Sequence, residues 1–238
     1  MILDKFEFSS DECWYNSVCS LFSTDKCCQS CVRYMQMYYL FNLGDIPKPL
    51  QYPKRLVPNE EDLSSFEDLQ AIKEDIVNFV NNGENLYIYS KNCGNGKTTW
   101  AVKLLAKYFD EIWAGNGFTC RGVFVRVGKL LNRLKKSIGD KDTALPEYIR
   151  TLKKCDLVVW DDIGEYKLSV FEQQSILEII DDRLYANKAN IYTSNVIDNL
   201  LLDNVGPRLH SRILNSSIQI EFIGDDRRIE NGSITDTK

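Results

Sequence analysis

The stretch that most constrains the fold is residues 89–99, which read YSKNCGNGKTT. Its second half matches the phosphate-binding loop G-x-x-x-x-G-K-[ST] at Gly96, Lys97 and Thr98, while Lys91 stands where the pattern has its first glycine. An apolar run, LYIYS, precedes the loop, and a helical pattern, KTTWAVKLLAKYF, follows it. This order of strand, loop and helix is the setting that such a loop requires, so the stretch predicts a nucleotide site in an α/β fold.

The loop has the residue types that bind phosphate. Backbone N–H groups of such a loop and the following helix N-terminus bind phosphate oxygens, and Gly94 and Gly96 allow close approach. Lys97 is predicted to reach the β- and γ-phosphates of ATP, and Thr98 to offer its hydroxyl to Mg²⁺. The residues predicted to bind nucleotide are Cys93, Gly94, Asn95, Gly96, Lys97, Thr98 and Thr99. A glycine-containing turn without a ligand is the weaker interpretation.

Short apolar runs recur along the chain, at residues 86–90, 122–127, 156–160, 190–194 and 218–222. Each is rich in β-branched or aromatic residues, which favours strands. Helical patterns separate them, and apolar residues spaced by three and four predict one helix over residues 63–80. Strands that alternate with helices predict a mostly parallel sheet covered on both faces.

Two acids follow the third run, in the stretch LVVWDDIGE at residues 157–165. A buried strand that ends in a carboxylate places that carboxylate at the edge of the sheet where ligands of open α/β folds bind. Asp161 is predicted to bind Mg²⁺, directly or through water, and Asp162 to orient or activate the attacking water. The alternative is a strand followed by a solvated acidic turn.

The fourth run ends in Asn195, in the stretch NIYTSN. Its amide is predicted to lie near the two acids and the γ-phosphate, where it would position the water. The alternative is a helix N-cap formed by Ser194 or Asn195. Further along, Arg208 and Arg212 lie four residues apart on one face of the probable helix GPRLHSRIL. An arginine from a neighbouring subunit can stabilise a transferring phosphoryl group, although, taken in isolation, a solvated or salt-bridged helix face is the better explanation of the spacing.

Composition limits the other possibilities. The net charge of −5 argues against a strong, nonspecific grip on DNA by the whole surface. The chain has no run of 18 apolar residues, and its N-terminus is too acidic for a signal peptide, so a cytoplasmic protein without a membrane partner is expected.

Five cysteines crowd the first 31 residues: Cys13, Cys19, Cys27, Cys28 and Cys31. In a cytosolic chain such a cluster indicates metal binding before disulfides. Because the one histidine, His210, is far away, the ligands would be thiolates, with Cys13, Cys19, Cys28 and Cys31 predicted to bind one zinc ion and Cys27 as the alternative to Cys28. An iron–sulfur cluster or reduced free thiols are the other possibilities.

The chain divides into four parts. Residues 1–46 hold the cysteines, residues 47–60 form a linker with four prolines, residues 61–230 form the α/β domain, and the polar residues 231–238 are expected to be disordered.

Together these motifs resemble the DnaC/IstB branch of the AAA+ ATPases, the bacterial and phage replicative-helicase loaders. The resemblance covers about residues 60–230 and runs through GNGKTT, LVVWDDIG, IYTSN, GPRLHSRI and FIGDDRR. In that family these are the Walker A, Walker B, sensor 1, arginine-finger and sensor 2 regions.

The resemblance implies a P-loop domain with a five-stranded parallel sheet in the order 5-1-4-3-2 and little or no lid. It implies an ATPase, weak alone, that uses ATP and Mg²⁺ and self-associates. Arg212 would act as the arginine finger on a neighbouring subunit and Arg228 as the sensor 2 arginine, with Arg208 and Arg227 as second choices.

Loaders of this kind bind the hexameric helicase through their N-terminal segment and act on single-stranded DNA. The aromatic run RYMQMYYLF, at residues 33–41, is either a partner surface or packing around the zinc site. The best local DNA patch is residues 127–137, with Leu130, Leu131 and Leu134 facing inward and Lys129, Arg133, Lys135 and Lys136 facing solvent. An ordinary solvated helix face is an equal alternative for this patch.

Two other functions stay open. A transposition-regulator ATPase of the IstB kind shares the same core, although the cysteine-rich segment favours the loader. A non-hydrolysing, nucleotide-binding adaptor is supported by Lys91 alone, and Lys97, Asp161 and Asn195 argue against it.

Overall fold

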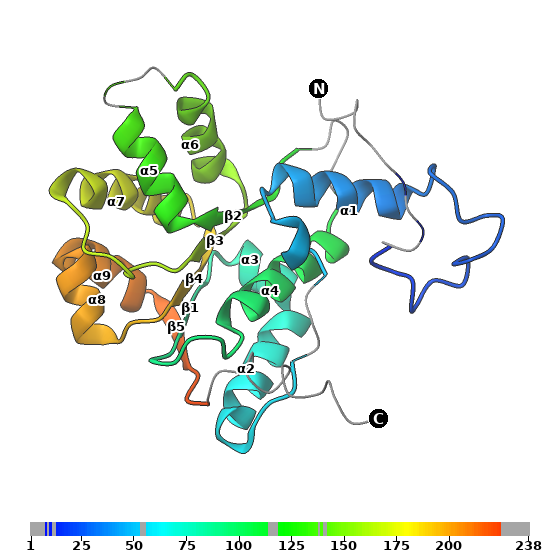
Figure 1. Ribbon diagram of the computed structural model, residues 1–238, viewed down its shortest axis with the longest axis horizontal. Helices are drawn as coiled ribbons and strands as arrows, with labels where there is room; N and C mark the ends of the chain where they lie inside the picture. The colour runs from blue at the N-terminus through cyan, green and yellow to red at the C-terminus, as the bar shows by residue number, and fades with distance from the viewer. Residues whose placement is uncertain are drawn as a thin grey trace, which may run out of the picture.

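A five-stranded parallel sheet forms the centre of the computed structural model, which describes residues 8, 10, 13–52, 56–113, 119–137, 139 and 142–224 (Figure 1). The strands are β1 Asn85–Tyr89, β2 Gly122–Arg126, β3 Leu157–Asp161, β4 Ala189–Ser194 and β5 Ser217–Glu221. Their order is β2-β3-β4-β1-β5, and every neighbouring pair is parallel. This confirms the five predicted strands and the order 5-1-4-3-2, read from the other edge.

Helices cover both faces of the sheet (Figure 1). On one side lie α1 Val32–Leu43, α2 Leu63–Glu74, α3 Ile76–Asn81 and α4 Lys97–Glu111, with the 3₁₀ turns η2 Lys48–Leu50 and η3 Glu60–Asp62. On the other lie α5 Val127–Lys136, α6 Leu145–Lys154, α7 Val170–Tyr185, α8 Asp198–Val205 and α9 Pro207–Leu214. Each side has its own hydrophobic cluster, so the fold has three layers.

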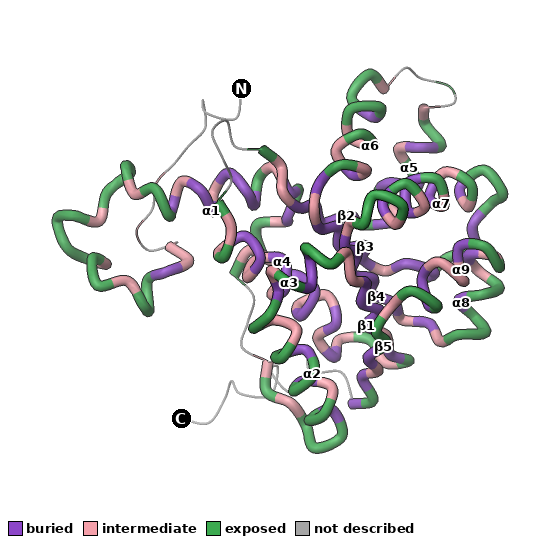
Figure 2. Tube along the Cα trace, turned by 180° about the vertical axis from the view of Figure 1, so that it is seen from behind, coloured by how far each residue is buried: buried purple, intermediate pink, exposed green. Residues whose placement is uncertain are grey.

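Strands β1 to β4 are short and apolar because both of their faces are buried, whereas the edge strand β5 is largely exposed. Successive side chains alternate between the two clusters, with Leu157 and Val159 on the side of α4 and Val158 and Trp160 on the side of α7. Figure 2 shows the strands as a buried band inside a more exposed shell. Since all pairings are parallel, the carboxyl ends of all the strands reach one edge of the sheet.

The predicted helix over residues 63–80 is two helices. The backbone leaves helical geometry at Asp75 (φ −109°, ψ 28°), between α2 and α3. The Asn78 amide donates to the Asp75 carboxylate at 2.6 Å, and the new direction buries Phe79 and Val80. Periodicity did not reveal this break because apolar spacing is nearly the same on both sides of a single-residue kink. Helix α3 ends with Asn82 as C-cap and Gly83 at φ 65°.

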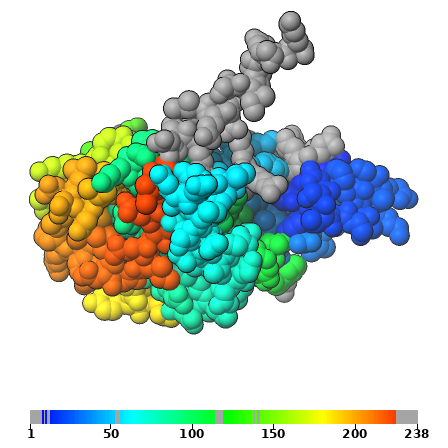
Figure 3. Space-filling view, turned by 90° about the horizontal axis from the view of Figure 1, so that it is seen from below, coloured from blue at the N-terminus to red at the C-terminus, as the bar shows by residue number. Residues whose placement is uncertain are grey.

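Helix α1 joins the cysteine-rich segment to the α/β domain. The predicted partner surface at residues 33–41 is wrong, because most of this run is buried and Phe41 packs edge-on against Phe109 of α4 at 5.9 Å. Beyond α1, the Gly44 carbonyl accepts a hydrogen bond from Phe124 N–H of β2 at 2.8 Å. The N-terminal segment therefore shares a hydrophobic core with the sheet, which includes Tyr15, while residues 20–31 extend outward (Figures 1 and 3). In the described part of the chain, no helix has the length and apolar character needed to cross a bilayer.

A buried arginine closes the amino edge of the sheet. Arg183 of α7 is fully buried, and its guanidinium donates to the carbonyls of Leu152, Cys155 and Ala189 and to the Asn190 side chain. These acceptors belong to the end of α6, the entry to β3 and the start of β4. One planar cation thus satisfies backbone acceptors from three elements.

We expect Arg183→Lys to destabilise the protein by about 3 kcal/mol or more, because one ammonium cannot reach acceptors on several sides and buried carbonyls would lose their donors. Urea denaturation measures the change. Arg150→Lys is the matched control, since the Arg150 side chain is 60% exposed. Equal unfolding midpoints for the two variants would contradict the structural role of Arg183.

Candidate functional site

The predicted site residues gather at the carboxyl edge of the sheet. The phosphate loop follows β1, Asp161 ends β3, and Asn195 follows β4. Tyr89 pairs in register with Ser194, so the exits of β1 and β4 lie side by side. Residues separated by about a hundred positions in sequence are therefore neighbours.

The phosphate loop turns without its usual first glycine. Lys91 is exposed and does not have a positive φ, whereas Gly94 and Gly96 have φ values of 76° and 102°. A side chain at position 96 would also be crowded, since an added Cβ would lie 2.8 Å from Leu56 Cδ1. The glycines that the loop needs are present, and its entry turn does not need one.

Lys97 is held inside the loop. Its side chain is buried, and Nζ donates to the Asn92 carbonyl at 2.8 Å and to Asn95 Oδ1 at 3.0 Å. Asn95 Nδ2 in turn donates to Ser90 Oγ at 2.5 Å. The loop is braced by its own side chains, and the Lys97 charge lies at the N-terminus of α4, where backbone N–H groups favour anions.

Thr98 and Asp161, the two predicted magnesium ligands, are in direct contact. Thr98 Oγ1 donates to Asp161 Oδ1 at 2.8 Å. The same oxygen accepts from Thr193 Oγ1 at 2.9 Å. Sequence reasoning missed Thr193, although a polar residue inside the buried strand β4 was a usable signal. A hydroxyl and a carboxylate brought together are oxygen ligands of the type that Mg²⁺ prefers.

Asp162 and Asn195, the two predicted catalytic residues, are also in contact. Asn195 Nδ2 donates to Asp162 Oδ1 at 3.2 Å, and Asp162 N–H donates to Thr193 Oγ1 at 3.1 Å. Asp162 has a φ of 58°, an uncommon value for a residue with a side chain. The N-cap alternative for Asn195 is wrong, because α8 begins at Asp198 with Ile197 as its N-cap. A carboxylate and an amide are thus held together beside the phosphate loop.

The carboxyl group of Asp161 is electrostatically unusual. Burial, and then the neighbouring Asp162 carboxylate, raise the Asp161 pKa to about 6. The hydrogen bonds from Thr98 and Thr193 and the charge of Arg126 act in the opposite direction. A buried acid beside a second acid is a common arrangement where a cation binds.

The chain that leaves β5 is tied to the phosphate loop. Asn92 Nδ2 donates to the carbonyls of Ile223 at 3.0 Å and Gly224 at 3.3 Å. The buried Asp62 carboxylate accepts from the N–H groups of the same two residues. Sequence reasoning missed both contacts, because nothing in the sequence pairs residue 62 or 92 with residue 223. The predicted sensor 2 residues, Arg227 and Arg228, lie outside the described residues.

The predicted arginine finger is paired within its own chain. Arg212 of α9 contacts Asp181 of α7 through Nε, with a distance of 2.5 Å to Oδ1. Arg208, one turn earlier on the same helix, is exposed. The contact with Asp181 agrees with the salt-bridged alternative for a single chain.

The predicted DNA patch on α5 is only partly available. Leu130, Leu131 and Leu134 are buried as expected. Of the four outward charges, three have carboxylate partners: Lys129 with Asp45, Arg133 with Asp142 and Lys135 with Glu172. Because these pairs neutralise most of the patch, the ordinary solvated face is the better description of α5 in this chain.

The cysteine cluster is close-set but not arranged as a metal site. Burial raises the Cys13 pKa, and the nearby thiols of Cys27, Cys31 and Cys19 raise it further. Cys28 is exposed and lies 3.0 Å from the Ser30 hydroxyl. Among the residues that the structure describes, no three His, Cys, Asp or Glu side chains are positioned to hold a metal ion.

Comparison with known families matches residues 62–206 to the family described as IstB-like ATP binding protein. This region contains the phosphate loop, both acids and Asn195. No curated protein sequence is significantly similar to the chain.

Several solved structures share the fold. The crystal structure of the DnaC helicase loader has a TM-score of 0.60 and 22% identity, over 74% of this chain and 99% of that one. The crystal structure of DnaI has a TM-score of 0.60 and 17% identity, over 74% of this chain and 94% of that one. AMPPCP-bound DnaA from Aquifex aeolicus has a TM-score of 0.58 and 18% identity, over 79% of this chain and 56% of that one. At these identities the likeness shows a shared fold, and together with the family match and the strand order it identifies the AAA+ P-loop fold.

We expect Asp161→Asn to stabilise the protein in EDTA at pH 7.5, by about 2 kcal/mol, because ionising a buried acid beside Asp162 is costly. The folded-state pKa is raised from 3.8 to about 6, so the cost is fully present above pH 6 and absent below 3.8. Urea denaturation of both proteins at pH 7.5 and at pH 4 measures the difference, which should shrink at the lower pH. A variant less stable than the parent at pH 7.5 would show that the Asp161 charge is not penalised.

Proposed function

The chain belongs to the family of IstB-like ATP-binding proteins, and on that premise we propose that it is an ATPase that loads a hexameric replicative helicase onto single-stranded DNA. In this proposal residues 61–230 are the ATPase domain, residues 1–46 are the helicase-binding segment, and residues 47–60 connect them. The observation that carries the ATPase activity is the contact of Thr98 with Asp161, because it joins the phosphate loop to the acidic strand end.

ATP binding follows from the loop. The N–H groups of residues 93–99 and the Lys97 ammonium would bind the phosphates, and the Lys97 contacts with Asn92 and Asn95 keep that charge at the α4 N-terminus. Thr98 and Asp161 would hold Mg²⁺, which when bound neutralises charge on the phosphates. The raised Asp161 pKa supports this role, because a bound cation would favour the ionised carboxylate.

Hydrolysis follows from the second pair. Asp162 would accept a hydrogen bond from the attacking water. Asn195 would hold the Asp162 carboxylate in place through the hydrogen bond that its side-chain amide donates to Oδ1. Asp162 is the residue whose backbone is left-handed, and in this role its side chain must point away from the strand. A non-hydrolysing adaptor has no use for this second pair, which favours the enzyme.

Two further observations favour the loader over the transposition regulator. The solved structures of a helicase loader and of DnaI are matched over nearly their full lengths. The chain also has a cysteine-rich segment before the ATPase domain. The family description IstB-like keeps the transposition regulator as the second candidate. For DNA, the exposed Arg126 at the end of β2 is the candidate phosphate contact, because Lys129 and Arg133 beside it are paired with Asp45 and Asp142.

The test is co-purification of the tagged chain with the replicative helicase of the same organism, with and without ATP. We expect capture of the helicase, and ATP-dependent release or remodelling that Lys97→Ala abolishes through loss of nucleotide binding. Lys154→Ala, at an exposed position on α6, is the matched control. Failure to capture the helicase, combined with capture of a transposase, would favour the second candidate.

We expect Arg212 to act on the nucleotide of a neighbouring subunit. Arg212→Ala and Lys97→Ala should each reduce ATP hydrolysis at least about a hundredfold, and a mixture of the two should regain activity. In the mixture, a Lys97→Ala subunit supplies its intact Arg212 to the intact phosphate loop of an Arg212→Ala subunit. Phosphate release measures the rates, and Arg208→Ala is the control. No recovery on mixing would mean that Arg212 does not act between subunits.

Although the cysteine thiols are not arranged as a metal site among the described residues, we propose that the cysteine-rich segment closes on a structural zinc ion through Cys13, Cys19, Cys31 and a fourth thiolate, because the thiols of Cys19, Cys27 and Cys31 lie near that of Cys13. The effect of Cys27 on the Cys13 pKa, and the exposure of Cys28, favour Cys27 as that ligand over Cys28. A small segment with few buried residues gains stability from such a site.

Elemental analysis of the purified chain should find one zinc per molecule. Cys13→Ser and Cys27→Ser should lose it, while Cys28→Ser should keep it. Zinc-free protein that is equally resistant to proteolysis between residues 13 and 31 would contradict the proposal, and loss of zinc in Cys28→Ser but not in Cys27→Ser would reverse the choice of ligand.

A further inference from the structure

A cavity of about 330 Å³ lies between the N-terminal segment and the helices of the ATPase domain. Its walls come from the residues around Trp14, from α1, from α2 and from the outer face of α4. Trp100 and Lys103 lie on the first two turns of α4, the helix that begins at the phosphate loop. The cavity is thus a separate site from the carboxyl edge of the sheet.

Two lysines give the cavity a positive charge. Lys73 of α2 and Lys103 of α4 both line it, and burial and the charge of Lys73 lower the Lys103 pKa. Lys103 Nζ lies over the Trp100 ring at 5.2 Å from its centre. Within the described residues, neither lysine has a carboxylate at ion-pair distance. Asp110 and Lys107 also line the cavity, but Asp110 is paired with Arg33 and Lys107 with Glu111. Two neighbouring lysines without carboxylate partners of their own favour an anion between them.

Two tryptophan N–H groups in the same walls also have no acceptor. The Nε1 atoms of Trp14 and Trp100 are buried and, among the described residues, lack a hydrogen-bond partner. The Trp100 side chain is only 5% exposed. An indole N–H can only donate, and a buried donor without an acceptor is costly. The cavity therefore offers donors and cations, and calls for a ligand rich in acceptors.

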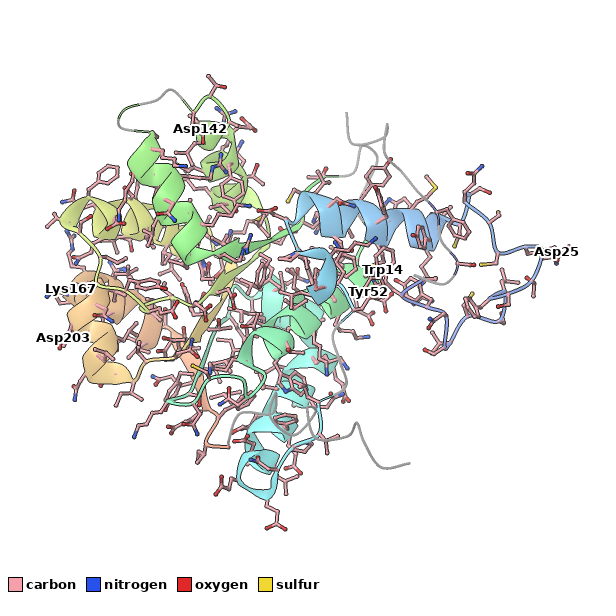
Figure 4. All side chains as sticks on the ribbon, in the orientation of Figure 1. Trp14, Asp25, Tyr52, Asp142, Lys167 and Asp203 are labelled. Atoms are coloured by element: carbon pink, nitrogen blue, oxygen red, sulfur yellow. The ribbon has the colours of Figure 1, made fainter. Side chains whose placement is uncertain are left out.

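The remaining wall is aromatic and includes the rings of Trp14 and Phe41, whose centres are 5.1 Å apart. Tyr52, which does not line the cavity, stacks on Trp14 with an angle of 4° between planes and 5.7 Å between centres and so fixes that ring. Figure 4 shows Trp14 and Tyr52 close together, below the middle of α1 in that view. Aromatic walls of this kind bind flat rings, including nucleobases.

We propose that this cavity binds a nucleoside 5′-phosphate, with its phosphate on Lys73 and Lys103 and its base against the aromatic wall. The volume lies within the range of about 300–1,000 Å³ that is usual for small-ligand sites. A nucleotide supplies acceptor oxygens and a flat ring, whereas the backbone of an acidic peptide would bring further N–H donors to walls that already lack acceptors. The nucleotide is either a free mononucleotide or one unit of a single strand, since both present the same chemistry.

The test is isothermal titration calorimetry on the full chain carrying Lys97→Ala, which removes the main phosphate contact of the ATPase site. Adenosine monophosphate and the oligonucleotide dT6 are the probes. We expect at least one of them to bind, and Lys73→Ala with Lys103→Ala to weaken that binding about tenfold or more, because two charge-assisted contacts are lost. Lys154→Ala, an exposed lysine on α6, should bind as the parent does. Binding of dT6 alone would identify the single strand as the source, and equal binding would identify the free nucleotide.

Two results would overturn the proposal. The first is unchanged binding of both probes in the double-lysine variant, once circular dichroism shows that it is folded. The second is binding of hexaglutamate to the parent without binding of either nucleotide probe, which would identify an acidic peptide as the ligand. Lys103→Gln, which keeps the length of the side chain and removes its charge, separates loss of charge from loss of packing.

Discussion

The hydrogen bond from Thr98 to Asp161 connects the two halves of the site and depends on the whole architecture. Thr98 begins α4, and Asp161 ends β3, two strands away from β1 in the sheet. They meet only because parallel pairing brings the carboxyl ends of β1, β3 and β4 to one edge. The buried, alternating side chains of these strands fix their register, and a slip of one residue in β3 would turn Asp161 away from the loop. Core packing and site chemistry are therefore set by the same residues.

Burying two adjacent acids at the site lowers the stability of the fold, and hydrogen bonds from neighbouring side chains partly offset this loss. Burial, and then the neighbouring Asp162 carboxylate, raise the Asp161 pKa to about 6. Thr98 and Thr193 each donate to the Asp161 carboxylate, while Asp162 takes an uncommon backbone conformation. Two apolar residues in place of Asp161 and Asp162 would cost less free energy to bury. The fold alone therefore does not explain the two acids, and a bound ligand would. In the proposed function, the stability lost at this edge is compensated by the binding of a cation.

Much of this arrangement could be predicted from sequence, because its signals are local. A buried strand that ends in acids and a glycine loop before a helix can each be located from the local sequence. The parallel topology then brings them together. Contacts between distant polar residues could not be predicted, as with Asp62 and Asn92 around Ile223. The break at Asp75 escaped for a related reason, since the apolar spacing continues through it. The charges of α5 were visible, but their partners Asp45 and Glu172 come from other elements.

The burial of α1 changes how the N-terminal segment can act. An aromatic run on a free appendage would be a surface for a partner, but here Phe41 packs on Phe109 of α4 and Gly44 is bonded to β2. Helix α4 carries Lys97 and Thr98 at its first turn, and further along it carries Trp100 and Lys103. A displacement of the cysteine-rich segment would be transmitted to α4 through packed side chains. Such packing resists compression and shifts between discrete arrangements instead. A nucleotide bound at the loop would contact the N-terminal end of α4. A partner bound at the N-terminal segment would act on the other end of α4, through the segment that packs there. Coupling between them requires only that the two ligands favour different positions of α4.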